Sequence, residues 1–231
     1  MTFLIAAVVL ATLPIGPPAA PSRDTSSGGI RAGWLAVSGD AVLRSSTAAA
    51  FGNAAVVTAL QAVLVVAATQ HFGRDTDVGW LYAAVGAGSL VGSAWFIRQN
   101  PRVIRRGLIV LLATTELAAT ATFTVVGNLA VALSLLFCAS IISVLHQVLA
   151  SIALQRRVPS NLLGRANGAT RLALYAGMFL GALAALGLVE PFGWEATVIA
   201  ICGGAAVLLF AASVTGPRDR GRPSPLTDLP D

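Results

Sequence analysis

Six long apolar stretches, separated by short polar segments, occupy most of the chain from residue 47 onward. A helix needs about 20 residues, at about 1.5 Å each, to cross the hydrocarbon core of a bilayer. The stretches that meet this length are Thr47–Thr69, Val78–Ile97, Gly107–Val126, Leu129–Leu154, Gly168–Val189 and Ala196–Val214. The pattern therefore predicts an all-α membrane protein in which residues 47–214 form a six-helix transmembrane bundle.

Residues 1–18 form a shorter apolar stretch with two interpretations. It is apolar from Phe3 to Leu13 and is then interrupted by prolines. One interpretation is a first transmembrane helix that starts outside the cell, which makes seven helices in all. The other is a signal-like segment, because a short apolar core followed by small residues is typical of a cleaved signal peptide, although no basic residue precedes this core.

Two polar segments flank the bundle. In residues 19–46, Ile30, Trp34 and Val37 recur at helical spacing between arginines, which predicts a short amphipathic helix on the cytoplasmic membrane surface. A disordered linker is the alternative for this cytoplasmic loop. Residues 215–231 are rich in proline and carry mixed charge, so we expect a disordered cytoplasmic tail.

Composition agrees with a membrane protein, because 56% of the residues are hydrophobic, 11% are charged and the mean hydropathy is +0.79. Soluble domains usually have about 25% charged residues. The net charge of +5 comes from arginines near the ends of the apolar stretches. It therefore does not indicate a nucleic-acid partner.

The arginines fix the expected orientation. All the basic residues are arginine, and only Arg74 lies outside one alternate set of polar segments. The members of that set are Arg23, Arg31, Arg44, Arg98, Arg102, Arg105, Arg106, Arg156, Arg157, Arg165, Arg171, Arg218, Arg220 and Arg222. Basic residues near span ends are retained on the cytoplasmic face. We therefore expect a multi-pass protein of the cell membrane, inner or plasma, with its C-terminus in the cytoplasm.

A stripe of polar residues follows one face of the stretch Leu129–Leu154. Its members, at i, i+3, i+7 and i+11, are Ser140, Ser143, Gln147 and Ser151, and His146 borders them. At about 100° per residue they fall within an arc of about 80°. The stripe predicts a helix that lines a substrate cavity, although serines that bond their own helix backbone would also explain it. A weaker stripe in Thr47–Thr69 contains Asn53, Thr58 and Gln61.

Glu116 is the only acidic residue deep inside a predicted span. A carboxylate there costs about 3 kcal/mol on insertion scales, which marks it as a functional candidate. Counted from the cytoplasmic ends of their helices, Glu116 and His146 lie at similar depths of about 14 and 12 Å. The pair is therefore our candidate for proton coupling. The alternative is a permanently protonated Glu116 bonded to Thr120 or to a neighbouring helix.

Small residues four positions apart predict two helix-packing faces. One is formed by Gly88 and Gly92, reinforced by Gly86 and Ser89, and the other by Gly177 and Gly181.

The segment Leu154–Gly168, with the sequence LQRRVPSNLLGRANG, resembles a cytoplasmic loop of major facilitator superfamily exporters. That loop joins helices ten and eleven, and the resemblance is closest to the branch of macrolide-efflux and siderophore-export proteins. A second segment resembles a degenerate copy of the family's cytoplasmic gate loop, although the family's acidic residue is absent near Gln99 and Asn100. The gate-loop candidates from both segments are Gly92, Arg98, Arg102, Arg105, Arg106, Gln155, Pro159, Gly164 and Arg165.

The resemblance covers nearly the whole chain and implies the C-terminal half of a fold built from two six-helix bundles, with the substrate between them. The helices at residues 47–69 and 129–154 would line the cavity. Those at 78–97 and 168–189 would face the other half, in agreement with their glycine pairs. The helix at 107–126 would be peripheral, which argues against Glu116 in the translocation path.

These observations favour a proton-coupled exporter, an antiporter for a small amphiphilic compound such as a drug or macrolide. Its expected partners are the bilayer, the substrate, protons and an N-terminal six-helix half that is missing from this chain. The alternative is a truncated or vestigial membrane protein without transport activity. Because no catalytic constellation or phosphate loop is present in the sequence, we expect no enzyme, cofactor or metal.

Overall fold

The computed structural model describes residues 29–72, 76–98 and 105–215, and nearly all of them are helical. The elements are α2 (Gly29–Gly39), α3 (Ala41–Ala67), the π-helical turn η1 (Ala68–Phe72), α4 (Asp77–Arg98), α5 (Arg106–Phe123), α6 (Leu129–Arg157), α7 (Ser160–Phe192) and α8 (Trp194–Val214). Helices α3 to α8 are long and apolar enough to cross a membrane, which confirms the six predicted spans. The stretch at residues 1–18 and nearly all of the tail lie outside the described residues.

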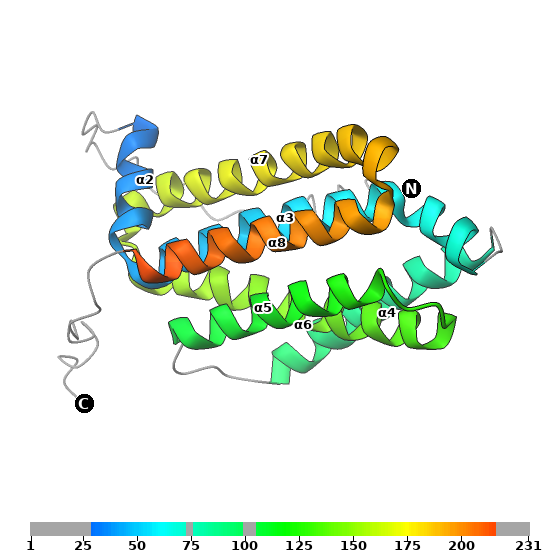
Figure 1. The fold of residues 1–231 in the computed structure, drawn as a ribbon. Helices are drawn as coiled ribbons and strands as arrows, with labels where there is room; N and C mark the ends of the chain where they lie inside the picture. The colour runs from blue at the N-terminus through cyan, green and yellow to red at the C-terminus, as the bar shows by residue number, and fades with distance from the viewer. Residues whose placement is uncertain (1–28, 73–75, 99–104, 216–231) are drawn as a thin grey trace, which may run out of the picture.

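The six long helices form two groups of three (Figure 1). Helix α3 packs most extensively against α7 and α8, whereas α6 packs most extensively against α4 and α5. Helix α3 also contacts α5, so the groups meet along a seam. At one end of the bundle α3, α5 and α7 begin and α6 and α8 end. We call it the arginine-rich end, because Arg44, Arg106, Arg157 and Arg165 lie there.

Helix α7 begins eight residues before the predicted span, at Ser160 rather than Gly168. Only Val158 and Pro159 separate it from α6. Val158 is extended, with φ −100° and ψ 129°, as expected for a residue before proline. Pro159 suits the start of a helix because it has no N–H that needs a partner there. The segment Leu154–Gly168, interpreted as a loop from its resemblance, is therefore helical except at this two-residue connection.

Helix α2 lies within residues 19–46, the segment for which the sequence allowed either an amphipathic helix or a disordered linker. It lies across the end of the bundle and packs against the start of α7 (Figure 1). Gly33 makes this contact possible, because a Cβ there would lie 2.3 Å from the carbonyl oxygen of Arg165. Val37 is buried, whereas Ile30 and Trp34 project outward. A helix thus replaces the linker over residues 29–39, and its position on the membrane surface stays a prediction.

Both predicted glycine pairs make close interhelical contacts. A Cβ on Gly177 or Gly181 would lie 2.2 Å from a backbone oxygen of α3, and a Cβ on Gly88 would lie 2.4 Å from a backbone oxygen of α6. Gly92 also faces α6, whereas Gly86 faces open space. Using the pairs as evidence for contact with another half was therefore wrong. The spacing of glycines identifies a helix face, and these faces pack inside the bundle.

Asp40 connects the start of α3 with the end of α6. Its Oδ1 accepts hydrogen bonds from the N–H groups of Val42 at 2.8 Å and Leu43 at 3.0 Å, which caps α3. Its Oδ2 accepts a charge-assisted bond of 2.9 Å from Arg157 at the end of α6. The cap explains why α3 starts at Ala41, six residues before the predicted span.

We expect the cap to stabilise the fold more than the ion pair. Asp40→Asn keeps a capping oxygen and should lower the free energy of unfolding by less than about 1 kcal/mol, since both charged side chains are partly exposed. Asp40→Ala loses both interactions and should cost about 1 kcal/mol more. Thermal unfolding in detergent measures both variants. Equal losses would show that the Arg157 contact dominates.

Candidate functional site

Four polar side chains from three helices form a hydrogen-bonded network inside the bundle. Asn53 on α3 donates through Nδ2 to Oε1 of Glu116 on α5, and also to Oγ of Ser143 on α6 at 3.2 Å. Gln147, one turn further along α6, donates through Nε2 to the same Oγ at 3.1 Å. Glu116 is buried, at 5% exposure. The network therefore bridges the seam between the two helix groups.

The network lies between two apolar clusters. On α3, Leu43 belongs to the cluster at the arginine-rich end and Val56 to the cluster at the opposite end, with Asn53 between them. The same order holds on α6, where Leu149 and Leu136 flank the polar residues. Apolar packing thus holds the helices together on both sides of a polar band, where hydrogen bonds satisfy groups that lipid cannot.

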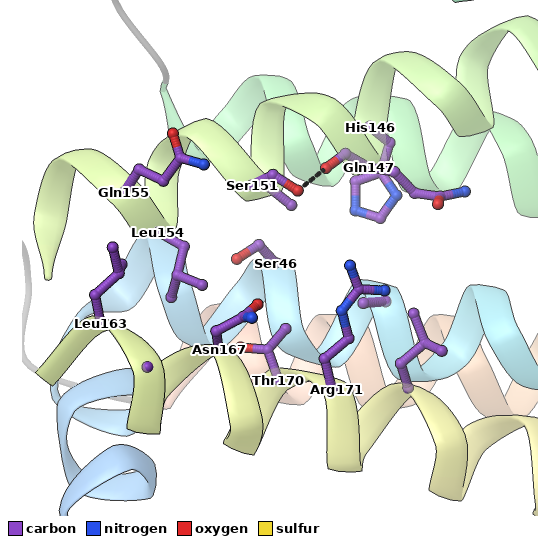
Figure 2. A pocket seen from close by; sticks show the side chains of 14 residues that line it. Ser46, His146, Gln147, Ser151, Leu154, Gln155, Leu163, Asn167, Thr170 and Arg171 are labelled. Carbon is purple, nitrogen blue, oxygen red and sulfur yellow. Dashed lines mark hydrogen bonds between the residues drawn. The ribbon is translucent and has the colours of Figure 1, made fainter. Parts of the chain in front are cut away.

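Two cavities meet at this band. The first, which we call the α4-side cavity, has a volume of about 260 Å³ and lies among α3, α4, α5 and α6. The second, the α7-side cavity, has a volume of about 480 Å³ and lies among α3, α6 and α7 (Figure 2). Gln147 lines both of them. The network therefore extends along the wall of one cavity to the edge of the other.

All members of the polar stripe on α6 line a cavity. Ser140 and Ser143 line the α4-side cavity, and His146 and Ser151 line the α7-side cavity. The backbone interpretation also holds for two serines, because Ser140 donates to the carbonyl of the residue four positions earlier at 2.8 Å, and Ser151 does the same at 3.0 Å. The two interpretations are thus compatible on one helix face.

On α3, Asn53 and Gln61 line the α4-side cavity, whereas Thr58 is not among its lining residues.

Glu116 and His146 do not contact one another through a hydrogen bond. Glu116 lines the α4-side cavity and His146 the α7-side cavity. Within the part of the chain that the structure describes, Oε2 of Glu116 and both ring nitrogens of His146 have no hydrogen-bond partner. Glu116 bonds to Asn53 on a neighbouring helix rather than to Thr120. Helix α5 packs against α3, α6 and α8, and its carboxylate points into the bundle and reaches α3.

Comparison with known families decides the class of this protein. A model described as Major Facilitator Superfamily matches residues 47–231, which include most of the first span and all of the other five. The chain belongs to the Major Facilitator Superfamily. No curated protein and no solved structure matches it. It is a multi-pass membrane transporter domain, and its family is one of transporters rather than enzymes.

Arg171 is a cavity residue of this major facilitator domain that sequence reasoning assigned only to an arginine loop. It lies in the fourth turn of α7 and lines the α7-side cavity. Its side chain points from α7 toward α6 (Figure 2). The helix-starting proline at position 159 was the available signal, since a helix that begins there places Arg171 three turns from its start, where the side chain is exposed and borders the cavity.

The gate-loop candidates occupy several positions. Arg102 and the side chain of Arg98 lie outside the described residues. Arg105 immediately precedes α5 and is exposed, and Arg106 is the first residue of that helix. Gln155 and Gly164 line the α7-side cavity near the arginine-rich end. Pro159 forms the α6–α7 connection, the backbone of Arg165 contacts α2, and Gly92 packs against α6.

Proposed function

We propose that this chain acts as the C-terminal half of a proton-coupled major facilitator exporter, an antiporter for a small amphiphilic compound. The observation that carries the proposal is the hydrogen-bonded network from Glu116 through Asn53 and Ser143 to Gln147. It connects a buried carboxylate in one cavity with the edge of a second, larger cavity. A proton gained or lost at Glu116 changes a network that both cavities share.

The depth of Glu116 supports a role for its proton. The residue lies ten positions after the start of α5, about 15 Å along the helix. A carboxylate at that depth costs about 3 kcal/mol on insertion scales, so intramembrane carboxylates commonly belong to ion or proton pathways. His146 is the second candidate, on the wall of the neighbouring cavity. Gln147, the next residue in the chain, belongs to the network through its bond to Ser143.

The open side of the cavities supports an N-terminal six-helix bundle as the partner. Among the described residues, the α7-side cavity is lined by three helices, α3, α6 and α7. In transporters of this type the substrate site lies between two helix bundles, and each bundle forms one wall. Exposed apolar side chains on α4 and α7, such as Trp95 and Phe179, suit lipid or a second bundle. We place the arginine-rich end in the cytoplasm, following the distribution of basic residues.

The resemblance of residues 154–168 supports the macrolide-efflux and siderophore-export branch. An exporter in that branch would carry the amphiphilic compounds that the mixed walls of the α7-side cavity suit, because Leu154, Leu163 and Leu174 lie beside Ser151 and Gln155.

Transport in proteoliposomes tests the proposal. The assembly that contains both bundles is reconstituted, a pH gradient is imposed, and accumulation of neutral, cationic and anionic fluorescent amphiphiles is measured. We expect at least one of them to accumulate with the gradient, and a protonophore to abolish its accumulation. Protein-free liposomes and liposomes with this chain alone are the controls. A folded assembly that moves no compound in response to the gradient would instead favour a vestigial protein without transport activity.

A further inference from the structure

The charge in the α7-side cavity comes from one side chain. Among the residues that line this cavity, Arg171 is the only charged one, and no acidic residue lines it. Arg171 makes no hydrogen bond or ion pair with any residue of the ranges 29–72, 76–98 and 105–215. The carboxylate nearest in depth, Glu116, lines the other cavity and is bonded to Asn53. The cavity wall therefore presents an unbalanced positive charge.

A second unpartnered group lies in the wall of the same cavity. His146 is fully buried, at 0% exposure, and neither of its ring nitrogens has a hydrogen-bond partner among the described residues. Its imidazole and the guanidinium of Arg171 point toward one another from opposite walls of the cavity (Figure 2). A buried polar group without a partner costs about 1–3 kcal/mol. Both ring nitrogens have almost no exposed surface in this structure, so a ligand bonds the imidazole only after the His146 side chain rotates into the cavity, and that bond then removes this cost.

The two residues lie at the same depth. Arg171 is eleven residues from Ser160 at the start of α7, and His146 is eleven residues from Arg157 at the end of α6. Because these helix ends are joined by two residues, both side chains lie about 16 Å from the connection. A guanidinium inside a membrane is costly without a counter-charge. At this depth the counter-charge has to come from a bound ligand or from the facing bundle rather than from the membrane surface.

We propose that the α7-side cavity binds the carboxylate of an organic anion between Arg171 and His146. The planar guanidinium donates two parallel hydrogen bonds to the carboxylate oxygens, and a neutral imidazole donates one more. Asn167 and Gln147 border the same space, and Leu163 and Leu174 offer an apolar surface to the rest of the molecule. This assignment rests on the proposed function and narrows its substrate to amphiphilic carboxylates.

Binding to the complete chain in phosphatidylcholine nanodiscs tests the site without a transport assay. The probe is 1-naphthoate, with 1-naphthamide as its neutral counterpart, and binding to empty nanodiscs is subtracted. We expect naphthoate to bind at least about tenfold more tightly than naphthamide, since a hydrogen bond to a charged group contributes about 1.5–3 kcal/mol. Arg171→Gln should weaken naphthoate binding about 10- to 100-fold and leave naphthamide binding unchanged.

Two further variants keep the test independent of folding. Arg171→Lys retains the charge and loses the planar fork, so we expect intermediate affinity. Arg31→Gln removes an exposed arginine of α2 outside the cavity and should bind naphthoate like the parent chain. Because the chain contains only two histidines, ¹⁵N-histidine labelling also reports contact directly. Naphthoate should shift the ring signals of His146 and not those of His71.

Equal affinity of the parent chain for naphthoate and naphthamide, or unchanged naphthoate affinity in a folded Arg171→Gln variant, would overturn the site. Either result leaves the proposed function standing if the assembly transports another amphiphile. Conversely, naphthoate binding that depends on Arg171 in an assembly without pH-driven transport would support the site and refute the exporter.

Discussion

Replacing Gly181 by alanine should lower the free energy of unfolding by about 1–3 kcal/mol, the usual cost of forcing extra volume into a packed interface. A Cβ at this position would lie 2.2 Å from the carbonyl oxygen of Ala55, 2.8 Å from its carbonyl carbon and 2.7 Å from its Cα. All three atoms belong to the backbone of α3, so no side-chain rotation relieves the overlap. Helix α7 has to move away from α3, and Gly177→Ala should have a similar effect.

The matched control is Gly187→Ala on the same helix. A Cβ on Gly187 meets no atom within 4 Å, and alanine favours a helix by up to about 1 kcal/mol over glycine. The control should therefore be neutral or stabilising in thermal unfolding of the purified protein. A loss at Gly187 equal to the loss at Gly181 would mean that helix flexibility, rather than close packing against α3, explains these glycines.

Glu116→Gln should abolish accumulation driven by a pH gradient while leaving the protein folded. Glutamine keeps an oxygen that accepts the hydrogen bond from Asn53, so the contact between α3 and α5 survives. Only the exchangeable proton is lost. With one proton per substrate, a gradient of one pH unit supports about tenfold accumulation. The variant should therefore reduce the accumulation ratio from about ten toward one in proteoliposomes, and downhill transport should persist.

His146→Ala separates the two candidates for proton coupling. Because His146 lines the other cavity and has no hydrogen bond to Glu116, we expect this variant to need a higher substrate concentration and still to respond to the pH gradient. Full accumulation in both Glu116→Gln and His146→Ala would exclude coupling through either residue.

The sequence was sufficient to identify the six long helices between residues 41 and 214, because a run of about 20 apolar residues has few alternatives to a membrane helix. It placed some helix ends badly. Residues 160–167 contain Ser160, Asn161 and Arg165, and this polar composition suggested a loop. Composition reports the surroundings of a segment, whereas hydrogen bonding decides its secondary structure. Helix α7 therefore continues beyond its apolar part.

Periodicity likewise predicted which residues share a face of one helix, but it could not predict which residues of different helices contact each other. It placed Ser143, Gln147 and Ser151 on one face of α6, and the structure gives that face to the two cavities. The bond between Asn53 and Glu116 joins residues 63 positions apart, and no spacing rule relates such positions. The placement of Arg171 and His146 on facing helices could not be predicted for the same reason, because it depends on which helices become neighbours.

The connection of Val158 and Pro159 limits how this bundle can change shape. Three Cα–Cα steps of about 3.8 Å cover at most about 11 Å, so the ends of α6 and α7 stay together in every conformation. Any widening between these helices is a rotation about that corner, and displacement grows with distance from it. Helix α6 has 29 residues and is about 43 Å long. A tilt of about 10° would therefore move its far end by about 7 Å and the level of His146 by about 3 Å. The Val158–Pro159 connection therefore acts as a pivot. Separation of α6 and α7 is smallest at the arginine-rich end and largest at the opposite membrane face.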